Sequence, residues 1–334
     1  AMANGGIIGP LQEASETSLS AKVSTFNSSG TFTAQATANA DYLVVGGGGG
    51  GGKAGGAGGG GAGGYRASGF GPSPLRGSAV PVVGGTAYSI TVGGGGAVDT
   101  SGNNSVFSSI TSAGGGRGGA VCGGTAGGTG PTTGANGGSG GGGSAGASAP
   151  GGSGNTPPVS PSQGSNGGSS TGPQPAQSKL SGGGGGGATA AGENAVGAPQ
   201  PGGTGAPSTR AGNGGAGAPN TISGSDVSYA GGGGGGKCAA QGQGQSCGGA
   251  GGGGRGNYGP SGDGGSEATA GSDNTGGGGG GGGDCGSSAP FTFGKAGGSG
   301  VVIIKEPSAT VKSAPGMWTL SEVYDQVKRG IWTN

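Results

Sequence analysis

The stretch DYLVVGGGGGGG, residues 41–52, decides the fold of this chain. Its first half, 41–45, is apolar and rich in residues that favour strands, which predicts a strand buried on both faces. Its second half, 46–52, is glycine without interruption, so this strand leads directly into backbone that carries no side chains. Further unbroken glycine blocks occupy residues 182–187, 231–236 and 276–283.

Glycine makes up 105 of the 334 residues, and a chain of this composition is by default a flexible linker or a disordered segment. Two features favour an ordered structure. Only 8% of the residues are charged, unlike typical disordered chains, and the glycines form pure blocks next to short apolar stretches. Collagen is excluded because its triple helix requires glycine at every third position without a break, whereas the unbroken glycine blocks of this chain do not keep that period.

The remaining interpretation is a packed array of polyglycine II helices. Such a helix has about three residues per turn and no internal hydrogen bonds, so neighbouring segments must satisfy its buried N–H and C=O groups. Ordering a glycine costs roughly 0.5–1 kcal/mol relative to alanine, and one hydrogen bond contributes about 1 kcal/mol net. We therefore expect the array to persist only as a laterally saturated bundle attached to strands that have an apolar core.

Short strands are predicted on both sides of the glycine-rich region. They span residues 30–34, 41–45, 88–92, 106–110, 291–293 and 300–304. The predicted fold is therefore mainly β, with a small antiparallel β-module, a large inserted bundle of polyglycine II helices and a short C-terminal α-helix. The predicted parts are an N-terminal arm (1–29), the β-module with a first glycine-rich insertion (30–113) and the glycine-rich bundle (114–290). The closing strands of the β-module (291–305) and a linker with the C-terminal helix (306–334) follow.

The stretch WTLSEVYDQVKRG, residues 318–330, predicts a short helix that docks on another surface. Thr319 and Glu322 fit a capping box, and Gly330 follows as a stop signal. A helix this short is marginal alone, so its apolar face is expected to pack on the β-module or on a partner subunit. The candidate docking residues are Trp318, Leu320, Val323, Tyr324, Val327 and Trp332.

Two clusters of aromatic and arginine residues are candidates for contact with a receptor or a partner, because such residues commonly anchor interfaces. The first cluster comprises Tyr65, Arg66, Phe70 and Arg76. The second comprises Arg255, Asn257 and Tyr258. The alternative, which the sequence leaves open, is that these side chains cap the glycine segments or pack on the strands.

Catalytic functions are not expected, and no cofactor is predicted. The chain has no histidine, which removes Ser–His and Cys–His dyads and imidazole metal sites. Two glycine blocks followed by lysine resemble a phosphate-binding loop. However, Ala54 and Cys238 stand where serine or threonine is required.

Acidic and cysteine residues form no metal-binding pattern in the sequence. The four cysteines include no CxxC pair, so zinc is not expected. Cys238 and Cys247 could close a loop as a disulfide, and reduced cysteines are the equal alternative. The acidic residues of the second half lack the spacing of calcium-binding repeats, and they are Asp263, Glu267, Asp273 and Asp284.

The charge of the chain argues against two classes of partner. Its net charge of +1 gives no electrostatic reason to expect nucleic acid or a membrane surface. No apolar segment approaches the roughly 20 residues that a helix needs to cross a bilayer, so membrane insertion is not expected. The first residues lack the basic and apolar regions of a secretory signal, so secretion through one is not expected either.

Several stretches together resemble the glycine-rich virion proteins of tailed bacteriophages. They are MANGGIIGP (2–10), YLVVG (42–46), GVVII (300–304), GMWTLSEVY (316–324) and GIW (330–332). In that group a strand-rich module carries glycine-rich insertions, and members are structural or tail fibre proteins. The glycine region is also similar to receptor-binding adhesins of T-even-like phages, in which polyglycine II helices form a sandwich and distal loops touch the host. The chain departs from those adhesins because strands bracket its glycine region and no fibre-attachment domain can be matched.

The resemblance implies a non-enzymatic virion protein, such as a tail fibre or fibre-tip adhesin, located in the virion and extracellular after release. Its expected partners are other virion proteins and a receptor on the bacterial outer surface. Two alternatives stay open, namely a capsid or tail decoration protein that binds only virion subunits, and an extracellular matrix or ice-binding protein. The sequence does not determine the host, the receptor, the number of glycine helices, or whether the chain forms a homotrimer.

Overall fold

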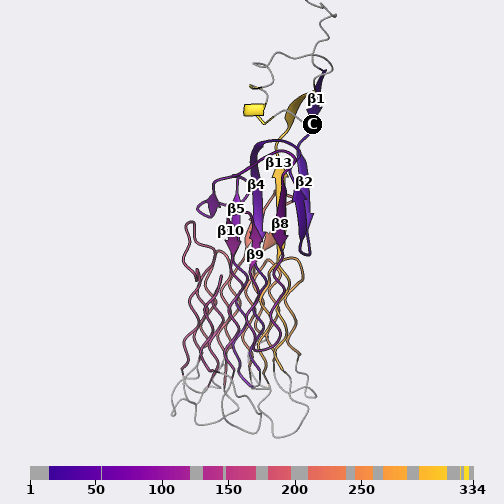
Figure 1. The fold of residues 1–334 in the computed structure, drawn as a ribbon. Coiled ribbons are helices and arrows are strands. Elements are labelled where there is room, and N and C mark those ends of the chain that lie inside the picture. Colours follow the sequence, from indigo (N-terminus) through magenta and orange to yellow (C-terminus); the bar gives the residue numbers. More distant parts are fainter. Residues whose placement is uncertain are drawn as a thin grey trace, which may run out of the picture.

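The structure is a computed structural model in which β-sheets continue into a bundle of long extended segments (Figure 1). It describes residues 15–53, 55–120, 131–145, 148–170, 180–196, 210–237, 245–258, 266–283, 293–313, 324 and 327–330. The fold is mainly β, as predicted, and no helix with defined bounds occurs in these ranges. Within them, no helix is long and apolar enough to cross a membrane.

The β-module has three layers. Its strands are β2 (Lys22–Phe26), β3 (Gly30–Thr33), β4 (Ala38–Val45), β5 (Tyr65–Ser68), β6 (Arg76–Gly77), β7 (Val80–Val82), β8 (Ala87–Thr91), β9 (Ser105–Phe107), β10 (Ile110–Ser112), β11 (Ala218–Asn220), β12 (Val227–Tyr229) and β13 (Val301–Glu306). The central sheet has the order β2-β13-β4-β5-β6, with β7 also paired to β4. A sheet of order β10-β9-β8-β3 covers one face, and the β11-β12 pair covers the other. All pairs are antiparallel except β5-β6, and neither of the larger sheets closes into a barrel among the described strands.

Strand β4 supplies side chains to two separate hydrophobic cores, which confirms the prediction that 41–45 is buried on both faces. Tyr42 and Val44 pack under the four-stranded sheet. Leu43 and Val45 point the other way and pack with residues of β11-β12. Because burying each such side chain contributes about 1.5–3 kcal/mol, this strand provides the apolar anchor that the glycine segments lack.

The first and last strands extend the central sheet into a ribbon. Strand β1 (Ser15–Leu19) pairs with β14 (Ala309–Ser313) in the same antiparallel register that joins β2 to β13. The break between the two pairs contains Pro307, which has no N–H to donate to a ladder. Residues 15–26, which we predicted to be part of an extended arm, therefore form strands that pair with β14 and β13.

Two predicted strands differ from the structure. The single strand predicted at 106–110 is wrong, because the chain turns at Ser108 and forms the hairpin β9-β10. Ser108 has a φ of 51°, a left-handed conformation that interrupts a strand. Of the strand predicted at 291–293, only Phe293 is described, and it does not lie in a strand.

Hydrogen bonds in the glycine-rich region run between segments rather than within them. In segment 46–52, every third N–H donates to the same neighbour, and the three neighbours are the antiparallel segments 58–64, 100–103 and 295–298. The carbonyl groups of 46–52 accept with the same period of three. Their donors lie in the parallel segments 96–99, 115–118 and 279–282.

The hydrogen bonds arrange the segments in a hexagonal pattern. Segment 57–64 lies at the centre and bonds to six segments, which in order around it are 46–52, 113–120, 138–145, 180–188, 230–237 and 275–283. Each of these ring segments also bonds to the next one. An outer layer surrounds the ring and consists of 93–99, 100–104, 131–137, 149–155, 163–170, 189–196, 210–217, 245–251, 252–258, 266–274 and 293–300.

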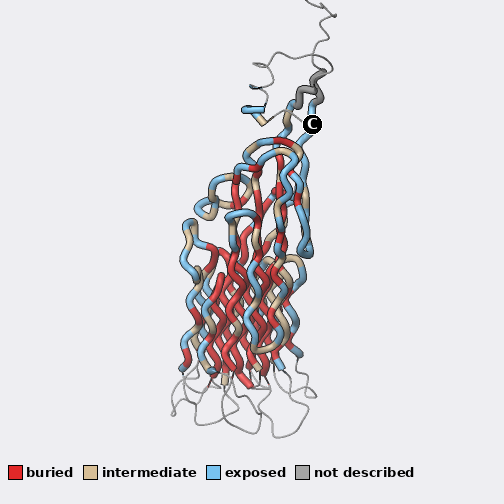
Figure 2. Tube along the Cα trace, viewed as in Figure 1, coloured by how far each residue is buried: buried red, intermediate tan, exposed pale blue. Residues whose placement is uncertain are grey.

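The place of a segment in this pattern explains its composition. The central and ring segments are buried (Figure 2), and apart from their end residues and Arg117 they contain only glycine, alanine and serine. A methyl group at Gly48 would lie 2.5 Å from the carbonyl carbon of Gly277, a separation that real Cβ atoms essentially never show. Outer segments have one side free of neighbours, so they carry most polar and charged residues.

Arg117 is a long side chain within the ring, and its position has a structural reason. Among the described residues, no outer segment bonds to 113–120 between 100–104 and 131–137. The Arg117 side chain therefore has room, and its Nη1 donates to the carbonyl oxygen of Gly118 at 3.1 Å. The guanidinium thus supplies the Gly118 carbonyl with the hydrogen bond that a neighbouring outer segment would otherwise donate.

Side-chain oxygens of outer-layer residues accept hydrogen bonds from backbone N–H groups of neighbouring segments. Asn166 Oδ1 accepts from the Gly154 N–H at 2.9 Å, in place of a backbone carbonyl. Asn104 Oδ1 does the same for the Gly114 N–H at 2.9 Å. Four further side chains accept from a backbone N–H in the same way, and they are Asn136, Asn194, Asn213 and Asp273.

The described residues do not support the predicted C-terminal helix or its docking. Tyr324 and Val327 are 64% and 57% exposed, so neither is buried against the module. The other candidate docking residues, Trp318, Leu320, Val323 and Trp332, lie outside the described residues.

Candidate contact surface at the end of the glycine bundle

The first predicted contact cluster lies in the β-module. Tyr65 is only 1% exposed, and its hydroxyl donates to the Pro219 carbonyl oxygen at 3.2 Å and accepts from Asn220 Nδ2 at 2.7 Å. Burial raises the pKa of Tyr65 to about 12, because the phenolate is poorly solvated there. Tyr65 therefore packs inside the module.

The remaining members of this cluster also make contacts within the module. Phe70 lies under the Lys305 ammonium, whose Nζ is 4.2 Å from the ring centroid. Arg76 Nε donates to the Gly71 carbonyl oxygen. Arg66 is half-buried in β5. The packing alternative thus accounts for the contacts of Phe70 and Arg76, and their role in partner binding stays a prediction.

The second predicted cluster lies in outer segment 252–258, whose last described residue is at the end of the bundle away from the β-module (Figure 1). Arg255 is exposed. Asn257 is 1% exposed, and its Oδ1 has no hydrogen-bond partner. Tyr258 is half-buried. The structure therefore brings the members of this cluster to the far end of the bundle, with one buried acceptor unsatisfied.

Lys237 joins this cluster, although we did not select it from the sequence. It is the last residue of ring segment 230–237 and is 1% exposed, with its Nζ 5.4 Å from the centroid of the Tyr258 ring. Its Nζ has no hydrogen-bond partner. Burial lowers the pKa of Lys237, because it removes water from the ammonium. The sequence signal was the position of this lysine directly after a glycine block, which we weighed only as a phosphate loop.

A second lysine stands over an aromatic ring at the same end of the bundle. Lys53 follows glycine block 46–52, and its Nζ lies 4.8 Å from the centroid of the Phe293 ring. Phe293 is 42% exposed. Segment 275–283 bonds to the segments of Lys53, Phe293, Lys237 and Tyr258. The two lysine–aromatic pairs therefore flank the same glycine segment.

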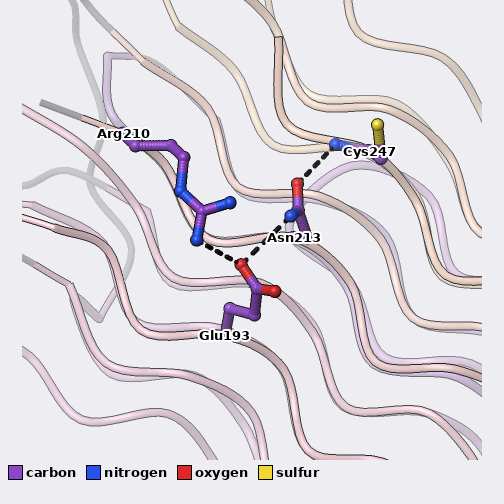
Figure 3. Close-up of polar contacts among 4 residues, drawn as sticks. All are labelled: Glu193, Arg210, Asn213 and Cys247. Atoms are coloured by element: carbon purple, nitrogen blue, oxygen red, sulfur yellow. Dashed lines mark hydrogen bonds and ion pairs between the residues drawn. The ribbon is translucent and has the colours of Figure 1, made fainter. Parts of the chain in front are cut away.

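A polar network lies on the outer surface of the bundle (Figure 3). Glu193 Oε2 lies 2.7 Å from Arg210 Nη2 and accepts from Asn213 Nδ2 at 3.0 Å. Asn213 Oδ1 accepts from the Cys247 N–H at 2.8 Å, so the network joins three neighbouring outer segments. Because both ionic groups are more than 40% exposed, their pairing contributes at most about 1 kcal/mol.

The disulfide considered between Cys238 and Cys247 stays a prediction. Cys247 is exposed, and Cys238 lies outside the described residues. In the part of the chain that the structure describes, no group of three or more cysteine, aspartate or glutamate residues could hold a metal ion.

The comparison with known proteins points to a domain family. No curated protein matches the chain significantly. A family model described as a glycine-rich domain matches residues 25–306, which include the glycine bundle and the strands from β3 to β13. This match covers well over half of the sequence, and the chain belongs to this family of glycine-rich domains.

Proposed function

We propose that the chain is a non-enzymatic structural protein of a bacteriophage virion, either a tail fibre or a fibre-tip adhesin. In this role the far end of the glycine bundle is presented to a bacterial surface, and the β-module faces the rest of the particle. The complete lack of histidine in the sequence supports a role in binding rather than catalysis.

The observation that carries this proposal is the separation of the two ends of the molecule. The β1-β14 ribbon, in which the first and last described strands pair, lies beyond the sheets (Figure 1). The glycine bundle extends from the opposite side of the sheets. A chain with this arrangement can be attached at one end while it contacts a surface with the other.

We further propose that the glycine segments are polyglycine II helices. Three features support this assignment: the period of three in their hydrogen bonds, bonding of the central segment and of every ring segment except 113–120 to six neighbours, and contacts too close for a side chain. Such a lattice resists bending, because a segment cannot move without breaking hydrogen bonds to several neighbours. It therefore suits the rigid display of a binding end.

A decoration protein that binds only virion subunits is the second candidate. It is favoured by the exposure of Tyr324 and Val327, because large apolar groups at a surface often mark contacts between subunits. In this alternative, the glycine bundle serves as architecture and the far end makes no contact with a cell.

Two measurements test the proposal. Antibodies against the purified protein should label the tail or fibre tips of phage particles in electron micrographs, and labelling of the head surface would favour decoration. The purified protein should also bind bacterial cells and compete with phage adsorption, and Arg255→Ala with Tyr258→Ala should weaken both effects. Unlabelled particles together with a protein that neither binds cells nor competes would contradict the proposal.

A further inference from the structure

We propose that the far end of the glycine bundle binds an acidic polysaccharide, through two lysine–aromatic pairs that flank segment 275–283. The pairs are Lys53 with Phe293 and Lys237 with Tyr258. The inference rests on the proposed surface-binding function and specifies the class of ligand.

The two pairs are built in the same way. In each, a glycine block ends in a lysine, and the aromatic ring comes from a neighbouring outer segment that is hydrogen-bonded to that block. Segment 275–283 bonds to both blocks and to both aromatic segments. The end of the bundle therefore carries a lysine and an aromatic ring on either side of this buried glycine segment.

Each pair combines two groups that can bind an acidic sugar, an aromatic ring and an ammonium group. The face of an aromatic ring packs against the apolar face of a sugar ring, and an ammonium group attracts a carboxylate or a phosphate. Phe293 is well exposed and Lys53 is partly exposed, so this pair is accessible to a polymer. On the other side of segment 275–283, Lys237 is buried and the half-buried Tyr258 ring is the group open to contact, so a repeating polymer that reaches both rings would gain apparent affinity.

The buried pair contributes an unbalanced charge. Lys237 Nζ and Asn257 Oδ1 are both buried without hydrogen-bond partners, although their residues are joined by a backbone hydrogen bond of 3.0 Å. A buried cation without a hydrogen-bond partner is costly, and an anion nearby lowers this cost through the electric field even without direct contact.

The other described charges at this end leave an excess of positive charge. Asp99 Oδ1 accepts from the Lys53 N–H at 2.7 Å and offsets one lysine. Arg210 and Glu193 offset each other, and so do Lys295 and Glu267. Among the described residues, the positive charges of Lys237 and Arg255 therefore remain unbalanced, which favours an anionic over a neutral ligand.

The chain contains a matched control pair. Lys305 Nζ lies 4.2 Å from the centroid of the Phe70 ring, a geometry like that of the two end pairs. This pair is in the β-module, at the opposite side of the molecule from the proposed site. Lys305→Met thus removes a positive charge and a cation–π contact without touching the far end of the bundle.

The experiment measures binding of three polymers of similar length to the immobilised full-length chain. Polygalacturonate carries carboxylates, polyglycerol phosphate carries phosphates, and dextran is neutral. At least one acidic polymer should bind ten-fold or more tightly than dextran, and added salt should weaken that binding. The tighter of the two acidic polymers identifies the anionic group.

The variants then locate the site. Lys53→Met and Phe293→Ala should each weaken binding of the acidic polymer about ten-fold, Lys237→Met should weaken it several-fold, and Lys305→Met should leave it unchanged. Thermal unfolding of each variant checks that it is folded. Equal binding of dextran, no binding of either acidic polymer, or an equal loss in Lys305→Met would overturn the inference.

A competition arm separates this inference from the proposed function. If the protein binds cells and neither acidic polymer displaces it, the ligand class is wrong and the surface-binding function stands. If the acidic polymers bind but no bacterial cells do, the site exists and the proposed function is wrong.

Discussion

Gly48 and Gly277 lie so close to each other across the glycine bundle that no side chain fits between them. A Cβ atom at Gly48 would be 2.5 Å from the carbonyl carbon of Gly277. The Gly48 N–H meanwhile donates to Gly298 at 2.9 Å, so the same residue is held from another direction. The glycine content of this chain thus reflects close approach of backbones in a packed interior.

Replacement of Gly48 by alanine should destabilise the protein. The added methyl group overlaps the Gly277 carbonyl, and relief of the overlap requires ring segments 46–52 and 275–283 to separate. Overpacking of this kind costs about 1–3 kcal/mol. Chemical denaturation of Gly48→Ala should therefore show a lower free energy of unfolding than that of the unmodified chain.

Gly94→Ala provides the control for this effect. A Cβ at Gly94 would meet only Asn103 Nδ2, at 3.8 Å, and Gly94 is exposed. Alanine restricts the unfolded chain more than glycine does, so this change should be neutral or stabilising by about 0.4–1 kcal/mol. Equal losses of stability in Gly48→Ala and Gly94→Ala would contradict the packing that we describe.

Asn166→Ala should loosen the outer layer locally. This change removes the oxygen that accepts from the Gly154 N–H, at a cost of about 1 kcal/mol. Amide hydrogen exchange at Gly154 should become faster, while exchange at Gly48 in the interior should not change. Asn166→Asp keeps an acceptor oxygen and should retain most of the protection, and similar exchange in both variants would argue against a capping role.

Stability should fall in alkaline solution because of Tyr65. Its pKa in the folded chain is about 12, above the usual value of 10.0, so its stabilising contribution is complete below pH 10 and is lost as pH rises to about 12. A pKa difference of this size corresponds to about 3 kcal/mol. Denaturation across this pH range should show a smaller loss for Tyr65→Phe than for the unmodified chain.

Tyr324 gives the matched control for the alkaline transition. It is 64% exposed, so Tyr324→Phe removes one tyrosine hydroxyl from the chain and leaves the buried hydroxyl of Tyr65 in place. If Tyr65→Phe and the unmodified chain lose stability equally between pH 10 and 12, Tyr65 is not the group responsible.

Lys237→Met should stabilise the protein at neutral pH. The lysine Nζ is buried without a hydrogen-bond partner, and such groups cost about 1–3 kcal/mol or more when charged. Methionine has a similar length and no charge. Because the folded-state pKa of Lys237 is lowered, the penalty grows as pH falls, so the gain from Lys237→Met should be larger in acid than in alkali. A lower melting temperature for Lys237→Met at neutral pH would contradict this prediction.

The sequence allowed us to predict the parts of the fold that depend on simple patterns. The run at 41–45 has an apolar residue at nearly every position, which indicates burial on both faces, and the structure confirms it. Unbroken glycine blocks correctly indicated buried segments, because only a packed interior excludes every side chain.

Other parts depend on contacts between residues far apart in the sequence. Outer segments contain ordinary polar residues, so nothing local distinguishes Asn166, which caps a neighbouring backbone, from an asparagine in a loop. The hairpin at Ser108 depends on one left-handed residue inside a stretch that alternates like a strand. The pairing of β1 with β14 joins residues nearly three hundred positions apart, as in Ser15 with Ser313.

The candidate site was predicted only in part. Arg255, Asn257 and Tyr258 do lie at one end of the bundle, but Lys53, Lys237 and Phe293 were missed as partners in a contact surface. Each comes from a different segment, and the hexagonal arrangement that brings the segments together cannot be read from glycine spacing.

Amide hydrogen exchange of the glycine blocks tests the central claim most directly, because the account requires their N–H groups to be bonded to neighbouring segments. Blocks 46–52, 182–187 and 231–236 should exchange as slowly as strand β4 in the full-length protein, and far more slowly than the same sequences as free peptides. If the blocks exchange at the free-peptide rate while β4 is protected, the glycine-rich region is a flexible linker and the hexagonal bundle does not exist.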